Sequence, residues 1–523
     1  MRKNNLKSIR WWPAVAILAI TTVLLFWAGV GGEVHDAQNR FMKMASIIML
    51  GVLLLIVWFA LFSRIRSGVR WRGVGLIVGS IALFFMLFQY KGLDGNFYPI
   101  FEMRWGGTEL ARLQPTLGDN RNGAAKGENW LAETDYPQFL GPDRNADLSP
   151  KRPRISKDWT QSPPVLKWRQ PIGEGWSAFA IVGKNAITQE QRDGREFVTN
   201  YELETGAVIW SHADSSHFES GIAGNGPRAT PTIFADKVYT LGATGTLNCL
   251  DFATGREIWS RNVLSDYNAK LNEWGMSCSP LIVDSLVIVT AGGREGASLI
   301  ACNRNTGETV WQSGDSPIGY ASPVLTTLHG QSQILIFNAY NISSHQPDTG
   351  AELWSHPWDT RQPTTAQPVV LNDNRIFISS GYGTGAELFQ VSKTESGVWQ
   401  TARIWKSLTM KAKLTNVVHR EGYIYGLDDG ILACINIENG KRMWKRGRYG
   451  HGQLILLHDT LLIQAEKGYL ALVAASPDEF KEQARFAALD TKTWNNPAIS
   501  DNYVLVRNNR EAACYTLAFE SGE

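Results

Sequence analysis

The chain has 523 residues, of which 44% are hydrophobic and 19% are charged. Its 51 basic and 49 acidic residues give a formal net charge of +2, which is too balanced to indicate a nucleic-acid-binding protein. The nine histidines are scattered and the five cysteines stand far apart, so the sequence favours neither a metal site nor a disulfide framework.

Three apolar segments open the chain. Residues 11–30, 44–62 and 74–90 contain no Asp, Glu, Lys or Arg and are 20, 19 and 17 residues long. About 20 apolar residues span a bilayer, so we predict a membrane anchor over residues 1–90 with three transmembrane helices at these positions. A cleaved signal peptide is the alternative for the first segment, but the two further apolar segments favour an anchor.

Basic residues in the short loops predict the orientation of this anchor. The first ten residues contain four Lys or Arg and no acidic residue, and residues 63–72 contain four Arg. Residues 31–43 contain two basic and two acidic residues. The positive-inside rule therefore places the N-terminus in the cytoplasm, and three crossings place the rest of the chain outside. In a bacterium, this predicts an inner-membrane protein with a periplasmic domain.

Residues 91–134 are polar and rich in glycine, and we expect a linker there. A small ordered motif over residues 97–105 is the alternative.

Residues 135–523 carry a repeated motif of the form TGxxxW. It reads YELETGAVIW at 201–210, CLDFATGREIW at 249–259, CNRNTGETVW at 302–311 and PDTGAELW at 347–354, with a weaker copy, CINIENGKRMW, at 434–444. Each period holds four short apolar runs separated by turn residues, and no stretch has the periodicity of a helix. Such a repeat is typical of a β-propeller, in which each four-stranded unit packs on the next.

Tryptophans mark the period of this repeat, and we expect them to dock one blade on the next. Trp168, Trp210, Trp259, Trp311, Trp354, Trp405 and Trp444 are separated by 42, 49, 52, 43, 51 and 39 residues, and Phe486 follows 42 residues later. Eight markers predict an all-β, eight-bladed propeller, with seven blades as the alternative. The last blade lacks an outer strand, which we assign to residues 165–170. Deleting residues 1–150 should then leave a folded ring, whereas deleting residues 1–172 should open it.

The TGxxxW repeats, together with YPQFLGPDRNADLS at 136–149, resemble the PQQ-like (quinoprotein) propeller family. This family includes the noncatalytic propeller lipoprotein of outer-membrane β-barrel assembly and, more distantly from this chain, the quinoprotein dehydrogenases. The resemblance implies the fold but not an activity. The vicinal cysteine pair of the alcohol-oxidising members is absent, and the short connections between blades leave little room for a catalytic pocket.

Candidate site residues precede the first strand of each blade, where a propeller has the mouth of its central channel. Planar aromatic and basic side chains would suit a bound quinone, and carboxylate or amide oxygens would suit Ca²⁺. The candidates for cofactor binding are Trp176, Arg228, Glu273, Trp274 and Tyr320, and the same surface includes Lys411, Lys413, Asn416, His451 and Trp494. The alternative is that these side chains only fill or rim the channel. We assign no catalytic residue and no metal ligand.

Two functions remain open at this point. The first is a noncatalytic, membrane-tethered propeller that binds other cell-envelope proteins and needs no cofactor. The second is a membrane-bound dehydrogenase that oxidises a sugar or alcohol with PQQ and Ca²⁺. The resemblance and the compact blades favour the first.

Overall fold

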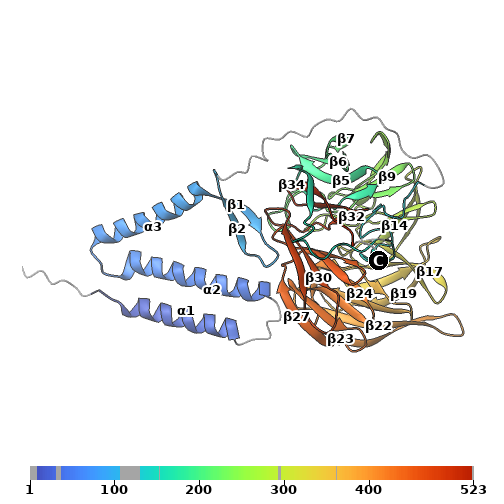
Figure 1. Cartoon of the computed structure of the whole chain (residues 1–523). Coiled ribbons are helices and arrows are strands. Elements are labelled where there is room, and N and C mark those ends of the chain that lie inside the picture. The colour runs from blue at the N-terminus through green and yellow to red at the C-terminus, as the bar shows by residue number, and fades with distance from the viewer. Residues whose placement is uncertain are drawn as a thin grey trace, which may run out of the picture. The chain divides into compact units, whose positions relative to one another are not determined.

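The computed structural model describes residues 9–30, 37–105, 130–151, 153–292, 296–360 and 362–520. The chain separates into two compact units, Met1–Glu109 and Leu110–Glu523 (Figure 1).

The first unit contains three long helices. They are α1 (Trp12–Val30), α2 (Ala37–Val57), which continues as the π-helical turn η1 (Trp58–Phe62), and α3 (Ser67–Leu87). All three are long and apolar enough to cross a membrane, by length and composition. Both α2 and α3 begin seven residues before the apolar segments predicted from the sequence, so they include basic residues, such as Arg40 and Arg70, that we had assigned to loops.

A β-hairpin follows α3 without a break; its first three residues, 88–90, were predicted as the end of the third transmembrane helix, and the rest lies in the segment that we expected to be a linker. Its strands are β1 (Phe88–Leu93) and β2 (Pro99–Met103), which pair in antiparallel fashion. The small ordered motif that we gave as the alternative for residues 97–105 is therefore part of this hairpin, which begins earlier, at the end of α3. Residues 106–129 of the expected linker lie outside the described residues.

The second unit is an eight-bladed β-propeller, which confirms the predicted fold and excludes seven blades. Each blade is a four-stranded antiparallel sheet, and most neighbouring blades contact one another through their first strands around the axis. From inner to outer strand, blade 1 contains β4 (Ala180–Val182), β5 (Asn185–Arg192), β6 (Arg195–Glu202) and β7 (Val208–Asp214), and blade 2 contains β8 (Thr232–Phe234), β9 (Lys237–Leu241), β10 (Thr246–Asp251) and β11 (Glu257–Asn262). Blade 3 contains β12 (Leu281–Val283), β13 (Leu286–Thr290), β14 (Leu299–Asn303) and β15 (Thr309–Ser313). Blade 4 contains β16 (Val324–Leu328), β17 (Gln331–Phe337), β18 (Asn341–His345) and β19 (Glu352–Pro357).

Blades 5 to 8 follow in the same order. Blade 5 contains β20 (Val369–Val370), β21 (Arg375–Ser380), β22 (Gly385–Lys393) and β23 (Trp399–Ser407), and blade 6 contains β24 (Ala412–Arg420), β25 (Tyr423–Asp428), β26 (Ile431–Asn436) and β27 (Arg442–Arg448). Blade 7 contains β28 (Gln453–Leu457), β29 (Thr460–Gln464), β30 (Tyr469–Ala474) and β31 (Glu482–Ala487). Blade 8 contains β32 (Ala498–Ser500), β33 (Tyr503–Arg507), β34 (Glu511–Thr516) and β3 (Val165–Pro171). A short 3₁₀ turn, η3 (Ser149–Lys151), precedes the ring, and a single helical turn, α4 (Val263–Asp266), interrupts the all-β pattern after β11.

Strand β3 closes the ring in the place that the sequence predicted. It pairs with β34 from Val165↔Thr516 to Pro171↔Glu511, so the last blade is built from both ends of the propeller. Its Arg169 forms an ion pair with Glu511, at 2.6 Å between Nε and Oε2.

The marker tryptophans lie on outer strands, and most of them reach the next blade. The indole Nε1 donates to a carbonyl of the following blade from Trp168 (to Leu203), Trp210 (Phe252), Trp259 (Arg304), Trp311 (Pro347), Trp405 (Ile437) and Trp444 (Ser476). The glycine of the next TG turn lies against the ring: a Cβ on Gly255, whose φ is +69°, would be 2.4 Å from Trp210 Cε3. The repeat therefore needs Gly both for the turn and for the close approach of the indole.

Trp354 differs from the other tryptophans. Its Nε1 donates to Gln333 Oε1 within its own blade, 2.8 Å away, and its ring packs on Phe389. In the next blade, the turn between β22 and β23 reads TESGV and has no TG pair in the position that the other blades use.

We expect Trp311→Ala to lower the free energy of unfolding by about 3–5 kcal/mol, because a large buried ring and an interblade hydrogen bond are lost together. The full-length protein in detergent would be unfolded with denaturant and followed by near-UV circular dichroism. Val310→Ala is the matched control, because Val310 is adjacent and 52% exposed. Equal stability of the two variants would exclude a docking role for Trp311.

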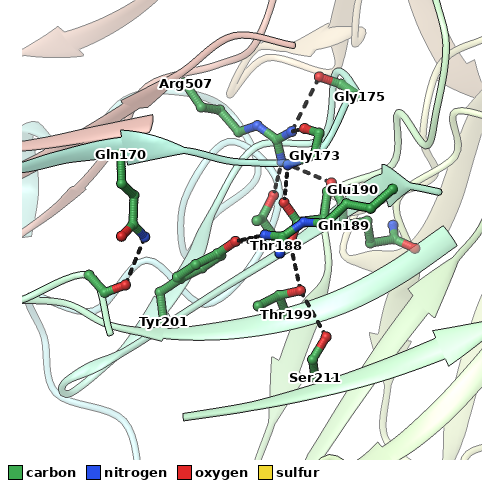
Figure 2. A network of polar contacts seen from close by, with 12 residues as sticks. Gln170, Gly173, Gly175, Thr188, Gln189, Glu190, Thr199, Tyr201, Ser211 and Arg507 are labelled. Carbon is green, nitrogen blue, oxygen red and sulfur yellow. Dashed lines mark hydrogen bonds and ion pairs between the residues drawn. The ribbon is translucent and has the colours of Figure 1, made fainter. Parts of the chain in front are cut away.

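Buried charges join blade 8 to blade 1 beside the closing strand (Figure 2). Arg507 of β33 donates to Thr188 Oγ1 (2.6 Å), to the Gln189 carbonyl (2.8 Å) and to the Gly173 carbonyl (3.1 Å). Glu190 of β5 accepts from Arg192, Thr199 and Tyr201 at 2.7, 2.6 and 2.9 Å. Both Arg507 and Glu190 are fully buried, so this network is part of the ring's core.

Candidate functional site

The sequence-predicted site residues lie at one end of the propeller axis, which we call the mouth. Each of them precedes the first strand of a blade or lies in it: Trp176 before β4, Arg228 before β8, Glu273 and Trp274 before β12, Tyr320 before β16, Lys411 before β24, Lys413 and Asn416 in β24, His451 before β28 and Trp494 before β32. The hairpins that join second and third strands end on the same side, because each second strand runs back towards it.

One group of aromatic side chains brings together blades 3, 4 and 5. The rings of Trp274 and Tyr320 are stacked with centroids 5.0 Å apart, and Tyr382 lies 6.0 Å from Trp274. Lys413 Nζ lies 4.6 Å above the Tyr382 ring, a distance typical of a cation–π contact. Tyr382 was not among the predicted residues. Its position in the β21–β22 turn, with φ at +57°, gives no motif that sequence reading could detect.

A second aromatic group joins blades 8 and 1. Trp176 and Trp494 have centroids 4.8 Å apart, and Lys492 lies 5.1 and 4.2 Å from their rings. Trp494 Nε1 donates to Glu466 Oε1 at 2.7 Å, and the backbone N–H of His451 donates to the other oxygen of Glu466 at 3.0 Å. Burial, followed by the charge of Lys413, lowers the pKa of His451 to about 3, so this imidazole is neutral near pH 7.

Other predicted residues are committed to structural contacts. Lys411 forms an ion pair with the buried Asp428, at 2.7 Å, and Asn416 accepts the backbone N–H of Gln367. Burial alone would raise the pKa of Asp428, but Lys411 and Lys445 hold it below its usual range. Lys411 and Asn416 therefore belong to the joints between strands and blades.

Arg228 folds back on its own loop. Its guanidinium donates to the carbonyls of Ala223, Gly224 and Gly226 and lies 4.4 Å above the Phe218 ring. Burial lowers its pKa to about 10. Glu273, by contrast, is exposed, so the structure gives these two predicted residues different environments.

The cofactor hypothesis can be tested against these side chains. The stacked Trp274 and Tyr320 would suit a planar ring, but Arg228 is held by its own loop. Within the described ranges, no three His, Cys, Asp or Glu side chains form a group that could hold a metal ion. Arg228 is therefore committed to its own loop, and we assign no catalytic step to these residues.

A belt of hydrogen bonds around the axis was missed by the sequence reading. Each neighbouring pair of blades is joined near its first strands: Ala178 N to Thr230 Oγ1, Thr230 N to Ser279 Oγ, Ser279 N to Ser322 Oγ, Ser322 N to Gln367 Oε1, Gln367 N to Asn416 Oδ1, Gln453 Nε2 to the carbonyls of Leu414 and Trp494, and Asn495 Nδ2 to the Ser177 carbonyl. The signal was present in Thr230-Pro231, Ser279-Pro280 and Ser322-Pro323. The polar side chain before each of these prolines accepts a hydrogen bond from a backbone N–H of the preceding blade.

Residues 136–149, which we call the strap, cross the end of the axis opposite the mouth. Tyr136 pairs with Ile181 of blade 1, and the Leu148 N–H donates to Leu456 of blade 7. Between them, the buried Arg144 donates to the carbonyls of Ser279 (2.9 Å) and Pro280 (3.0 Å) in blade 3. Burial lowers its pKa to about 10. Ile233 N of blade 2 also donates to the Pro137 carbonyl, so the strap ties together blades 1, 2, 3 and 7.

Glu196, near the mouth, should make stability depend on pH. Burial raises its pKa to about 7, while it accepts a hydrogen bond from Ala243 N of the next blade. Because the folded pKa exceeds the unfolded one, its stabilising contribution is complete below about pH 4 and is lost as the pH rises through 7. We expect Glu196→Gln to be more stable than the parent at pH 8, by up to about 3 kcal/mol, and not at pH 4. Denaturant unfolding at both pH values would show this, and an equal difference at the two values would contradict it.

Comparisons with known proteins agree with the geometry of the blades. A family model described as outer membrane protein assembly factor BamB matches residues 194–476, which is more than half of the chain. The chain belongs to this family of PQQ-like propellers. Among curated relatives, BamB of Alteromonas naphthalenivorans is 26% identical over 247 residues, covering 43% of this chain and 56% of that protein. A quinoprotein ethanol dehydrogenase of Pseudomonas aeruginosa is 26% identical over 138 residues, covering 23% of this chain and 21% of the enzyme.

The chain thus spans little more than half of one curated relative and about a fifth of the other. Among solved structures, the quinohemoprotein alcohol dehydrogenase of Comamonas testosteroni matches with a TM-score of 0.51 and 12% identity, covering 74% of this chain and 81% of that one. At this identity the likeness shows the fold alone.

Proposed function

We propose that this chain is a membrane-tethered propeller of the cell envelope that binds another envelope protein at its mouth and carries out no reaction. The observation that carries the proposal is the pair of aromatic groups, Trp274–Tyr320–Tyr382 and Trp176–Trp494, each with a lysine above a ring. Of these rings, all except the buried Trp176 are partly exposed, and Trp and Tyr are among the side chains that contribute most to the binding energy of protein interfaces. The likeness to BamB, named as an assembly factor, supports the same class of function.

The titratable groups of the mouth support a role in binding rather than in catalysis. A general acid or base needs a pKa near the working pH and access to a substrate. Burial keeps His451 neutral, and the Glu466 carboxylate is shared between Trp494 and the His451 backbone. Neither arrangement leaves a proton-transfer group facing the aromatic rings.

The binding proposal is tested by photocrosslinking in cells. A photoreactive benzoylphenylalanine at Tyr382 should give one discrete adduct with an envelope protein, and the same residue at Val310, on the outer strand of blade 3, should not. Trp274→Ala should reduce the Tyr382 adduct severalfold. The same adducts at both positions would show that the mouth is not the interface. In parallel, a bound-quinone spectrum after mixing with PQQ and Ca²⁺ would favour the dehydrogenase instead.

The proposed location is the bacterial inner membrane, with the propeller in the periplasm. A reporter fused after Glu523 should therefore be active only if it is of a type that works outside the cytoplasm, because three crossings follow a cytoplasmic N-terminus. Paired phosphatase and fluorescent-protein fusions at this position would measure it. A fusion active in the cytoplasm would overturn the three-span topology.

A further inference from the structure

The β1–β2 hairpin has two chemically different faces. Cross-strand pairs place Phe88 opposite Met103 and Tyr90 opposite Phe101, while Gln89 lies opposite Glu102. Because side chains alternate along a strand, the first two pairs share one face and the third lies on the other. On the first face, which we call the aromatic face, Tyr90 is 46% and Met103 58% exposed. A two-stranded sheet is marginal in water by itself, so such a face needs an apolar surface to cover it.

The hairpin is firmly attached to the end of α3. Strand β1 begins at the residue after the helix ends, and Arg104, just past β2, donates from its backbone N to the Leu87 carbonyl at 2.9 Å. The Phe84 ring of α3 lies 4.9 Å from Phe88 and 5.0 Å from Phe101. The aromatic face therefore continues the apolar surface of the helix.

The length of α3 places this face at a membrane boundary. Its last basic residue is Arg72, so the uncharged part of the helix runs from 73 to 87. At 1.5 Å per residue these residues cover roughly 22 Å, against the roughly 30 Å of a hydrocarbon core. The shortfall of about 8 Å corresponds to two or three residues of an extended strand. A helix that crosses the bilayer thus ends in the outer part of the hydrocarbon core, and the first residues of β1 carry the chain to the level where the lipid tails meet the headgroups.

We propose that the aromatic face of the hairpin rests in the membrane–water interface at the end of α3, so that its partner is the lipid surface. Aromatic rings with one polar end prefer this depth, and Lys91 can reach the headgroups. The unpaired edges of the two strands remain within reach of water and headgroups, which a deeper position would not allow. The hairpin then fixes the depth of α3 in the bilayer.

The test compares neighbouring positions on opposite faces. Met103→Cys and Gln89→Cys would each be made in the full chain, labelled with a nitroxide and reconstituted in lipid nanodiscs. All five native cysteines are buried, so the added thiol is the accessible one, and the unsubstituted chain measures any background labelling. Collisions with oxygen, which concentrates in lipid, and with a water-soluble nickel chelate are then measured by electron paramagnetic resonance. Val398→Cys, at an exposed turn of blade 5, is the aqueous control.

We expect the oxygen-to-nickel ratio at Met103 to be severalfold higher than at Gln89, and the ratio at Gln89 to resemble that at Val398. Equal, water-like ratios at Met103 and Gln89 would overturn the proposal. Low accessibility of Met103 to both reagents would also overturn it, because it would show that protein covers the aromatic face. Equally lipid-like ratios at the two positions would contradict an interfacial position and indicate full insertion.

Discussion

Removing residues 1–129 should leave the propeller as stable as in the full chain, whereas removing residues 1–150 should lower its melting temperature strongly. The second truncation deletes the strap, in which Tyr136, Leu140 and Leu148 are buried against the blades. Each large buried side chain lost from a core costs about 2–5 kcal/mol. The same cut removes Arg144, whose donors hold two carbonyls near the axis.

The sequence had suggested that residues 1–150 were dispensable, and the structure changes that expectation. Only the deletion of residues 1–172 was expected to harm the ring, because it removes β3. We now expect graded behaviour: no loss without 1–129, a large loss without 1–150, and an open, aggregating last blade without 1–172. Thermal unfolding of the three truncations, followed by near-UV circular dichroism, separates these outcomes. Matching melting temperatures for the first two would mean that the strap adds no stability.

The difference between the strap and the closing strand shows which features the sequence could reveal. Strand β3 was predictable because apolar and basic residues alternate around Trp168, and because the sequence of the last blade contained only three strands. The strap has no repeat, and three of its non-glycine residues, Leu140, Arg144 and Ala146, have positive φ. Its path depends on contacts with blades far away in the sequence, which no local periodicity encodes.

The mouth shows the same limit. Reading the residues before the first strands pointed to ten side chains, and the structure has each of them before or within the first strand of a blade. The sequence could not tell that Lys411 turns to Asp428, or that Arg228 closes its own loop. Those choices depend on the neighbouring strands and on hydrogen bonds to backbone carbonyls. They decide which side chains of the mouth remain at the surface.

Breaking the buried charge network between blades 8 and 1 should destabilise the ring from its closing joint. Arg507→Met removes donors to Thr188 and to the carbonyls of Gln189 and Gly173, and leaves these acceptors buried without their partner. Glu190→Gln leaves the Arg192 guanidinium without its buried counter-charge. Losing one partner of a buried charge network costs about 3–5 kcal/mol. Each variant should therefore lose about this much in denaturant unfolding at pH 7, whereas Glu204→Gln, in an exposed pair with Lys184, should change stability little.

The two losses should not add, and one of them should vanish in acid. Arg507 contributes to the electrostatic environment of Glu190, so the double variant should cost less than the sum of the single variants. Burial alone would raise the pKa of Glu190, but Arg192, Arg507 and the hydrogen bonds hold it below its usual value. Because the folded pKa lies below the unfolded one, the stabilisation is complete above about pH 4 and is lost as the pH falls through the folded pKa. The gap between the parent and Glu190→Gln should therefore shrink in acid. A gap that stays constant down to pH 3, or single losses that simply add, would show that Glu190 does not act as a buried anion coupled to Arg507.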